Sequence, residues 1–511
     1  MFLCLLFSCL LSHALCSDIL ALFPHTGKSH FAVFEPLVLA LAARGHQVTV
    51  ISFYPQNTAV ENYTDISLVG LVPQRVNNVQ FAQVENPARN YISMSRMGIE
   101  ICEKILQFRP VRELLDSDAS FDLLILELFY SDCLLGLAHK YDVPYILVAA
   151  SNTSPEKDSR VGTPAQTAYV SHLNLPLDSK MCFSQRLWNA AYSIFTYMVR
   201  VYFTAQDERT LHQLMGEEVS LRKVASDVSL LLANIHHSIV SARPLVPGHV
   251  EVGGIHIHPA RPVPKDLEKY LNESTDGAIL FSMGSVLQSS SFPPAKRQAI
   301  MDAFAELPVR VVMKWEDDTL PGKPDNVRLS KWLPQRDILA HPKIIAFMGH
   351  GGLLSTSEAV YCGIPMVLIP MFGDQPNNVA HLAASGAAVK LAYKEITKET
   401  VLKALRAVLY DSRYRESAKL LSERFRDRPM SPLDTAVYWT EYVLRHKGAR
   451  HLRSAAVDMP WYQLWLLDVA LVLLAGLAAV LFLVFWLARR VTTFISHRLY
   501  PHQPGQKQKK E

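Results

Sequence analysis

Short apolar runs alternate with amphipathic stretches through most of the chain, from residue 17 to about residue 463. In the first half, apolar runs that predict buried strands occupy residues 19–23, 47–52, 122–126 and 145–149. A helix is predicted over residues 30–44, because one of its faces would carry Phe31, Phe34, Leu37 and Leu41. A second series of apolar runs, each followed by a turn and a helical segment, occupies residues 278–281, 309–313, 344–347 and 366–369. This alternation predicts an α/β fold built on parallel sheets.

Two doubly wound domains are predicted on either side of a stretch rich in proline and glycine at residues 246–264, which we interpret as a linker. Residues 17–245 would form the N-terminal domain and residues 265–445 the C-terminal domain. Parallel sheets of this kind bind ligands outside the carboxyl ends of their strands, so we expect a binding cleft between the domains. The apolar stretch at residues 187–203 contains Arg200 and is predicted to be a packed helix; a helix lying on a membrane surface, or lining a binding pocket, is the alternative.

The two ends of the chain are its most apolar parts. Residues 1–16 contain no acidic residue and end in Ala14-Leu-Cys16, which predicts a cleaved signal peptide. A transmembrane helix is predicted at residues 464–488, because Val469–Leu487 runs for nineteen residues without a charge. At about 1.5 Å per residue this run covers roughly 28 Å, close to the thickness of a hydrocarbon core. A juxtamembrane segment and a basic tail would flank the span, at residues 446–463 and 489–511.

The basic tail predicts a single-pass type I topology, with the body in the lumen and the tail in the cytosol. Lys507 and Lys509 match a KxKxx retrieval signal, which indicates the endoplasmic reticulum membrane. Sequons for N-glycosylation begin at Asn62, Asn152 and Asn272, in keeping with a lumenal body, although Pro155 disfavours use of the second.

Composition and cysteine content exclude several classes of function. The formal net charge is +4 and no long basic stretch interrupts the body, so nucleic acid is not expected as a partner. Hydrophobic residues make up 49% of the chain and charged residues 19%, which excludes a disordered chain. Four cysteines would remain after removal of the signal peptide, without metal-ligand spacing, and allow at most two disulfides: Cys102, Cys133, Cys182 and Cys362.

Side chains suited to chemistry are densest between residues 332 and 375. The motifs in this stretch are Trp332-Leu-Pro-Gln335, His350-Gly-Gly352, Ser355-Thr356, Glu358 and Asp374-Gln375. With these motifs in this order, the chain resembles the UDP-glycosyltransferases over essentially its whole length. The resemblance implies a GT-B-like fold with two Rossmann-like domains, in which the N-terminal domain binds the acceptor and the C-terminal domain binds a UDP-sugar. The UDP-sugar would be a co-substrate, and no metal or other cofactor is expected.

The resemblance assigns the uridine and the phosphates to separate groups of residues. Trp332 would stack on uracil, because an indole offers a broad aromatic face. Gln335 would meet the ribose or the base, and Glu358 would hold the ribose hydroxyls. Glycines after the strand at residues 344–347 let the backbone of a helix start approach the diphosphate, to which His350 would add a hydrogen bond.

Further positions complete the expected donor site. At the phosphates, the resemblance adds Gly352, Ser355 and Thr356. A second backbone contact to the phosphates is expected near Ser282, Gly284 and Ser285. Asp374 and Gln375 would bind sugar hydroxyls, and Lys314 has a weaker assignment as a basic residue. Leu354 departs from the family pattern, because relatives commonly have asparagine at that position.

Glycosyl transfer needs an acceptor oxygen to lose its proton as it attacks, and a histidine suits the role of base. The family resemblance places this histidine at the start of the first helix. His30 in Gly27-Lys-Ser-His30 matches the family element, and His25 is the competing candidate. The base should have a carboxylate partner that fixes its tautomer. Glu127 stands where relatives usually have aspartate, and Asp132 is the other candidate.

The resemblance therefore implies an inverting, metal-independent hexosyltransferase that acts on small lipophilic acceptors such as phenols, steroids or pigments, in detoxification or conjugation of secondary metabolites. The stretches at residues 27–31 and 353–356 resemble insect members, which favours UDP-glucose over UDP-glucuronate. Two alternatives are transfer to a membrane lipid such as ceramide and a non-catalytic protein that binds nucleotide sugars. Assembly into homo- or hetero-oligomers is left open.

Overall fold

The structure, a computed structural model, describes residues 16–76, 86–216 and 218–499. It divides into two compact units, residues 1–454, which we call the body, and residues 455–511. The predicted signal peptide, apart from Cys16, and the predicted KxKxx signal lie outside the described residues.

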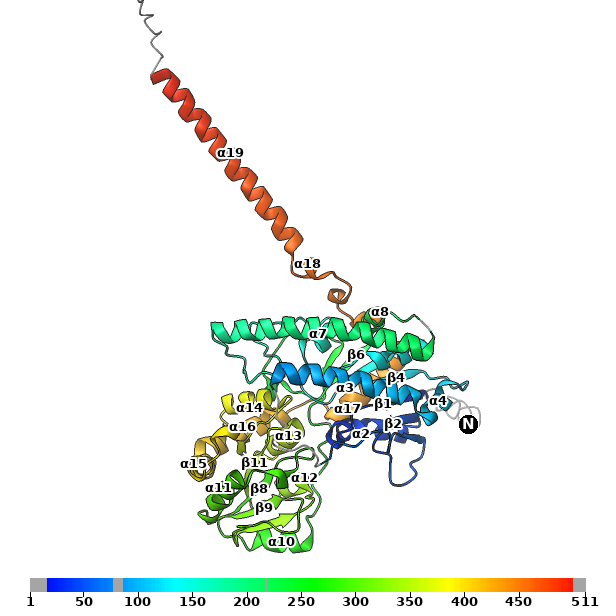
Figure 1. The fold of residues 1–511 in the computed structure, drawn as a ribbon, viewed down its shortest axis with the longest axis vertical. Helices are drawn as coiled ribbons and strands as arrows, with labels where there is room; N and C mark the ends of the chain where they lie inside the picture. Colours follow the sequence, from blue (N-terminus) through cyan, green and yellow to red (C-terminus); the bar gives the residue numbers. More distant parts are fainter. Residues whose placement is uncertain (1–15, 77–85, 217, 500–511) are drawn as a thin grey trace, which may run out of the picture. The chain divides into compact units, whose positions relative to one another are not determined.

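Seven parallel strands form the first sheet of the body, in the order β3-β2-β1-β4-β5-β6-β7 (Figure 1). The strands are β1 (Asp18–Phe23), β2 (Gln47–Ser52), β3 (Tyr63–Ser67), β4 (Leu123–Glu127), β5 (Tyr145–Ala149), β6 (Leu230–Ala233) and β7 (His249–Glu251). The register places Ile19 of β1 between Val48 of β2 and Leu123 of β4. The order reverses direction between β1 and β4, which is where a doubly wound sheet binds its ligand.

Strand β1 is apolar at almost every position because both faces of the sheet are covered. Leu20 and Leu22 belong to the core on one face, whereas Ile19, Ala21 and Phe23 belong to the core on the other. The first core is closed by α3 (Pro87–Gln107), α4 (Arg109–Leu115), α5 (Gly136–Tyr141), α7 (Phe183–Met215) and α8 (Leu221–Ala225). The second core is closed by α2 (Lys28–Ala43) and α17 (Pro432–Arg445).

Six parallel strands form the second sheet, in the order β10-β9-β8-β11-β12-β13. They are β8 (Ala278–Ser282), β9 (Arg310–Lys314), β10 (Val327–Ser330), β11 (Ile344–Gly349), β12 (Met366–Leu368) and β13 (Ala388–Lys390). One face packs on α11 (Pro294–Ala305) and α15 (Lys398–Tyr410). The other packs on α10 (Lys265–Asn272), α12 (Gln335–Leu339), α13 (Leu353–Tyr361), α14 (Gln375–Ala384) and α16 (Ser412–Arg426).

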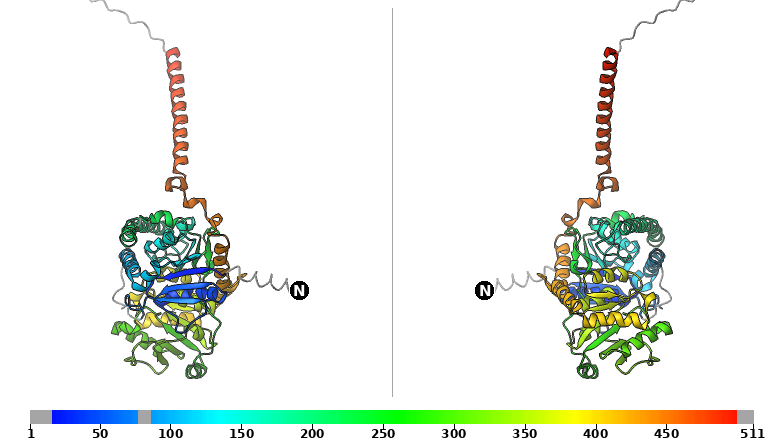
Figure 2. Two further views of the ribbon diagram at one scale, coloured as in Figure 1. Left: turned by 90° about the vertical axis from the view of Figure 1, so that its right-hand side faces the viewer. Right: turned by 90° about the vertical axis from the view of Figure 1, so that its left-hand side faces the viewer.

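Two segments cross the domain boundaries that the sequence suggests. The stretch at residues 246–264, expected to be a linker, contains β7, which pairs with β6. Val250 of β7 is part of the core of the first domain. After the second sheet is complete, α17 returns to the first domain and packs beside α2 (Figures 1 and 2). There Arg44 donates to Glu441 at 2.8 Å. Both domains therefore contribute to one body.

The second unit contains α18 (Trp461–Leu464) and α19 (Leu467–Leu499). Among the described residues, α19 is the one helix that is long and apolar enough to cross a membrane. It includes most of the predicted span at residues 464–488 and continues into the basic segment that follows.

Candidate active site

A cavity of about 650 Å³ lies between the two domains, at the carboxyl ends of strands from both sheets. From the first domain it is lined by residues that follow β1, β4 and β5, including His25, His30, Tyr130 and Ser151. From the second domain it is lined by residues that follow β8, β11 and β12, including Gly284, His350, Ser355 and Asp374. Parallel strands place their carboxyl ends at one edge, which explains why residues far apart in sequence meet here.

His30 and Glu127 form a hydrogen-bonded pair at the edge of this cavity. Nδ1 of His30 lies 2.5 Å from Oε1 of Glu127. His30 lies in the first turn of α2, which follows β1, and Glu127 is the last residue of β4, which pairs directly with β1. The Glu127 carboxylate is buried, and its Oε2 has no hydrogen-bond partner. With the carboxylate on Nδ1, Nε2 of His30 is the ring nitrogen left to accept a proton.

Asp132, the alternative carboxylate, is bound by two arginines. Arg160 contacts both of its oxygens, at 2.6 and 2.8 Å, and Arg200 of α7 also donates to it. Burial opposes ionisation of Asp132, but the two guanidinium groups outweigh it and hold the pKa of this carboxyl below its usual value. Of the two carboxylates, Glu127 is therefore the one bonded to His30. Asp132, in the turn after β4, instead binds Arg200 of α7.

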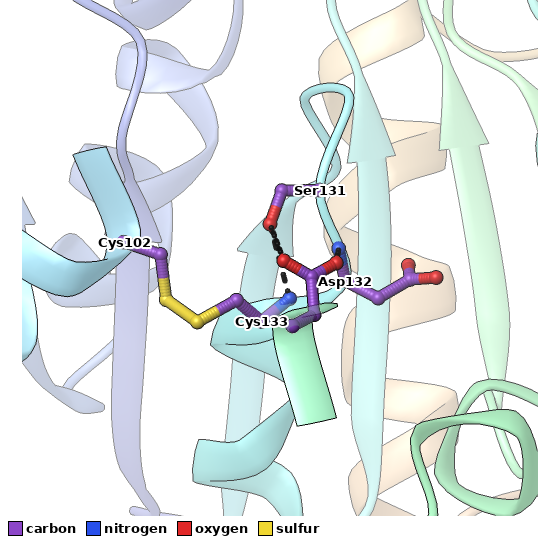
Figure 3. Close-up of a disulfide and its surroundings, with 5 residues drawn as sticks. Cys102, Ser131, Asp132 and Cys133 are labelled. Carbon is purple, nitrogen blue, oxygen red and sulfur yellow. Dashed lines mark hydrogen bonds between the residues drawn. A yellow bond between two sulfur atoms is a disulfide. The ribbon is translucent and has the colours of Figure 1, made fainter. Parts of the chain in front are cut away.

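A disulfide holds the same turn from the other side. Cys102 of α3 is bonded to Cys133, and next to it Ser131 Oγ and the Asp132 amide both donate to the Asp207 carboxylate of α7, at 2.8 Å each (Figure 3). This is the one disulfide among the described residues, within the limit that the cysteine count set. The chain that follows Glu127 is thus fixed to both α3 and α7.

His25, the competing candidate for the base, stacks against the ring of His30. The two rings are stacked with centroids 3.5 Å apart, and the edge of Phe129 contacts both. Nδ1 of His25 already accepts the Gly27 amide at 2.9 Å. Burial and the neighbouring charge of His30 lower the pKa of His25 well below its usual value, so it stays neutral. His25 therefore positions the ring of His30 and is poorly placed to gain a proton.

The start of α13 forms the opposite wall of the cavity. Its N-cap residue is Gly352, which offers no side chain to the first amides of the helix, so these N–H groups are free for an anion. The His350 ring is held between two glycines: a Cβ at Gly284 would lie 2.5 Å from its Cε1, and one at Gly352 2.4 Å from its Nε2. Burial, then the charge of Lys314, lowers the pKa of His350 to about 4, so the ring is neutral near pH 7. Its Nδ1 is buried and has no hydrogen-bond partner.

Residues expected at the phosphates divide into those that reach the cavity and those that support it. Ser285 and Ser355 line the cavity, as do Gly284 and Gly352. Thr356 is fully buried and its Oγ1 donates to the Gly352 carbonyl at 3.0 Å, so it steadies the first turn of α13. Ser282 is buried outside the lining and accepts from the Gly284 amide at 3.3 Å.

Trp332, Gln335 and Glu358 form a second group beside the cavity, outside its lining residues. Gln335 Nε2 donates to Glu358 Oε2 at 2.7 Å, and burial raises the pKa of Glu358 to about 7. Glu358 follows Ser355 by three residues on α13, so the two share a helix face. Trp332 is 52% exposed, and Lys28 of the first domain places Nζ 4.9 Å from its ring centroid. Lys28 was not a sequence candidate, although it stands two residues before His30.

Asp374 and Gln375 reach the cavity at the start of α14. Asp374 Oδ2 accepts from Asn378 at 3.0 Å, and burial raises the pKa of Asp374 although Asn378 and the charge of His30 oppose it. Gln375 Oε1 accepts the Met371 amide at 2.9 Å, which shapes the turn before the helix. Asn377, which the sequence did not single out, is fully buried and donates across the domains to Ser171 Oγ at 2.7 Å.

Several lining residues carried no sequence signal at all. Arg75, Asn90, Ser93 and Met94 line the cavity from the first domain. They belong to a loop and to α3, whose amphipathic pattern says only that one face packs inward. The structure also brings together a potential metal-binding group, which does not line the cavity: His236, His237 and Glu251.

The two facing parallel sheets are found in solved glycosyltransferases of the GT-B class. The calicheamicin glycosyltransferase CalG4 superposes with a TM-score of 0.56 at 18% identity, covering 84% of this chain and 99% of that chain. The spinosyn forosaminyltransferase SpnP superposes with a TM-score of 0.55 at 16% identity, covering 84% and 100%. The fold is therefore that of a GT-B glycosyltransferase.

Sequence similarity narrows the class to one family. A model of the UDP-glucuronosyl and UDP-glucosyl transferase family matches residues 4–498. UDP-glycosyltransferase UGT5 of Dactylopius coccus is 42% identical over 489 residues, covering 93% of this chain and 92% of the relative. UDP-glucuronosyltransferase 2A3 of Mus musculus is 30% identical over 497 residues, covering 92% and 91%. This chain belongs to the UDP-glycosyltransferase family and is a glycosyltransferase.

Proposed function

We propose that this enzyme transfers glucose from UDP-glucose to a hydroxyl group of small lipophilic acceptors, with inversion at the anomeric carbon. The observation that carries the proposal is that His30, bonded to Glu127, and the start of α13 line one cavity from opposite domains. Direct displacement needs a base on one side of the reacting carbon and stabilisation of a leaving anion on the other. This arrangement of a base and an anion-binding helix start meets both needs.

In the proposed reaction, the acceptor hydroxyl gives its proton to Nε2 of His30 while its oxygen bonds to the anomeric carbon. The bond between that carbon and the diphosphate oxygen breaks, and UDP leaves with the electron pair. Glu127 on Nδ1 orients the ring and stabilises the imidazolium that forms. The first amides of α13 and the neutral His350 ring donate to the diphosphate as its charge grows. The proposal requires no metal or other cofactor.

The remaining donor contacts follow from the second group of residues. Trp332 would stack on the uracil, and its half-exposed ring is accessible for this. The Gln335–Glu358 pair would meet the ribose, where a carboxyl whose pKa is raised to about 7 can either donate or accept a hydrogen bond. Asp374 and Gln375 would bind the sugar hydroxyls.

The proposal of glucose rests on the resemblance of residues 27–31 and 353–356 to insect members of the family and on one relative. Arg75 is the arginine among the described lining residues and would be the expected partner of a glucuronate. UDP-glucosyltransferase 2 of Dactylopius coccus, 38% identical over 512 residues and covering 99% of this chain and 98% of that relative, supports glucose by name.

We further propose that α19 anchors the enzyme in the endoplasmic reticulum membrane, with the body in the lumen and the tail in the cytosol. The length and apolarity of α19 support an anchor. The Cys102–Cys133 disulfide supports an oxidising compartment for the body. The basic residues after the span support the orientation.

Turnover measured with a panel of donors and acceptors tests the proposed function. The purified chain is supplied with UDP-glucose or UDP-glucuronate and with phenol, steroid or ceramide acceptors, and UDP affinity is measured separately by calorimetry. We expect turnover with UDP-glucose and a small acceptor, and its loss in His30→Ala with UDP affinity retained. Binding of UDP without turnover would indicate the non-catalytic alternative, and preference for ceramide would indicate a lipid-modifying enzyme. Preference for UDP-glucuronate that is lost in Arg75→Ala would overturn the choice of sugar.

A further inference from the structure

One buried side chain of the second domain is bonded to two separate stretches of the first domain. Asn377 lies in the first turn of α14 and is fully buried. Its Nδ2 donates to Ser171 Oγ at 2.7 Å and to the carbonyls of Leu175 and Leu177 at 3.2 and 2.9 Å. Its Oδ1 accepts from Asn152 Nδ2 at 3.1 Å. Both polar atoms of the Asn377 side chain are therefore bonded to the first domain.

Each of these two stretches carries a residue that lines the cavity. Ser151, which lines the cavity, is followed directly by Asn152. Leu173, which also lines it, lies within the bonded stretch at residues 171–177. Asn377 thus holds the chain beside both of these lining residues, although they are far apart in sequence.

The same helix start carries the residues that are proposed to bind the sugar. Asp374 is the N-cap residue of α14 and Gln375 is its first residue, and both line the cavity. The backbone amide of Asn377 donates to the Asp374 carbonyl at 3.1 Å, within the same turn. The position of Asn377 is therefore shared by the proposed sugar-binding residues and by part of the first-domain wall of the cavity.

A second residue of α14 extends this contact by one helical turn. Nε2 of His381 lies 3.4 Å from Ser171 Oγ, the same hydroxyl that accepts from Asn377. Burial, then the charge of Arg243, lowers the pKa of His381 to about 4, so its ring is neutral near pH 7. Hydrogen bonds between buried neutral groups depend on direction, and removing one partner leaves the other unpaired. The contact therefore favours one position of α14 against the first domain.

We propose that Asn377 is a positioning residue that keeps Ser151 and Leu173 in place opposite the sugar-binding start of α14. This inference rests on the proposed function, in which Asp374 and Gln375 bind the sugar. The acceptor oxygen must come within roughly 3–3.5 Å of the anomeric carbon to react, and a misplacement of about 1 Å can lower the rate roughly 100-fold. Asn377 acts on the alignment of the acceptor with the sugar and leaves the binding of UDP unchanged.

Steady-state kinetics of the full chain, with UDP-glucose and 4-nitrophenol, test the proposal. The test variants are Asn377→Ala and the milder Ser171→Ala, which removes one of the acceptors of Asn377. The matched control is Asn326→Ala. Asn326 Nδ2 donates to three backbone carbonyls of the second domain, at 2.8, 3.2 and 3.0 Å. The control therefore also loses hydrogen bonds to backbone carbonyls, but at a position outside the described lining of the cavity.

Three quantities separate alignment from general destabilisation. They are kcat and KM for 4-nitrophenol at saturating UDP-glucose, the dissociation constant of UDP by calorimetry, and amide hydrogen exchange over residues 171–177. We expect Asn377→Ala to lower kcat/KM for 4-nitrophenol roughly 10- to 100-fold, and Ser171→Ala to lower it less, with UDP affinity unchanged in both. Exchange over residues 171–177 should become faster in both variants. Asn326→Ala should lower the melting temperature without either change.

An unchanged kcat/KM in Asn377→Ala would overturn the proposal. An equal loss in Asn326→Ala would also overturn it, because the effect would then be general destabilisation, and a parallel loss of UDP affinity would overturn it in favour of a role at the nucleotide alone. If Asn377→Ala does not fold, Ser171→Ala decides by the same criteria. If the wild type shows no turnover with UDP-glucose, the proposed function fails and hydrogen exchange decides: unchanged exchange over residues 171–177 in Asn377→Ala would then overturn the positioning role.

Discussion

Replacing Glu127 by glutamine isolates the contribution of one negative charge to the proposed reaction. The Glu127 side chain is 2% exposed and its Oε1 lies 2.5 Å from Nδ1 of His30, so water cannot substitute for the bond. When His30 takes the acceptor proton, this hydrogen bond becomes charge-assisted, and such bonds contribute about 1.5–3 kcal/mol. At 1.36 kcal/mol for each tenfold change in rate, Glu127→Gln should lower kcat roughly 10- to 150-fold.

Glu127→Asp tests the same hydrogen bond by keeping the charge and lengthening the distance to His30. Aspartate is shorter by one carbon–carbon bond of about 1.5 Å, so its oxygen would lie about 4 Å from Nδ1, beyond hydrogen-bond reach. We expect a loss of kcat similar to that of the glutamine variant, although relatives commonly have aspartate at this position.

The assay measures kcat with saturating donor and acceptor, and the dissociation constant of UDP by calorimetry. UDP affinity should be unchanged, because Glu127 belongs to the domain opposite the proposed phosphate site. Glu441→Gln removes a carboxylate that pairs with Arg44, the residue that follows α2, and should leave kcat unaltered. An unchanged kcat in Glu127→Gln, with the fold intact, would refute the assignment of Glu127 as the partner of the base.

Three other measurements test separate parts of the structure. Gly352→Ala should weaken UDP binding roughly tenfold by calorimetry, because the new Cβ would lie 2.4 Å from Nε2 of His350 and displace that ring from the phosphates; unchanged affinity would contradict the packing. Burial, then the charge of Asp132, raises the pKa of Asp207 from 3.8 to about 7. Between these two pH values the folded state holds a proton that the unfolded state releases, so the free energy of unfolding should fall as pH rises from about 4 to about 7. In Asp207→Asn the melting temperature should depend less on pH than in the wild type. A pH dependence as steep as that of the wild type would contradict the assignment to Asp207. Asn272→Gln should remove one glycan and Asn152→Gln none in a gel-shift assay, because Asn272 is exposed whereas Asn152 is 1% exposed and hydrogen-bonded to Arg243.

The second-domain wall of the cavity could be predicted from sequence because its residues are close together along the chain. Gly352, Ser355 and Glu358 lie within seven positions of one another, so one strand, one turn and one helix place them all. Even there, position in a motif did not fix orientation. Thr356 is one residue from Ser355, yet it turns into the helix, because adjacent helical positions point about 100° apart.

The first-domain wall of the cavity depends on pairs of residues that no local pattern specifies. Glu127 and Asp132 are five residues apart and chemically equivalent, and the sequence left the choice open. The choice is made by the pairing of β4 with β1 and by Arg200, which lies 68 residues beyond Asp132. Lys28 and Trp332, on different domains, are likewise brought together only by the folded body.

The sequence by itself determined the alternation of strands and helices, the two-domain α/β fold, the apolar C-terminal helix and the motif residues that line the cavity from the second domain. These features follow from periodicity and from short-range order, which each segment carries locally. Only the tertiary structure decided which carboxylate meets His30, that β7 and α17 complete the first domain, and that α7 buries Asn189, Thr196 and Asp207. Each of these features is a contact between segments that are far apart along the chain. Such contacts form only when the chain folds, so no local pattern specifies them.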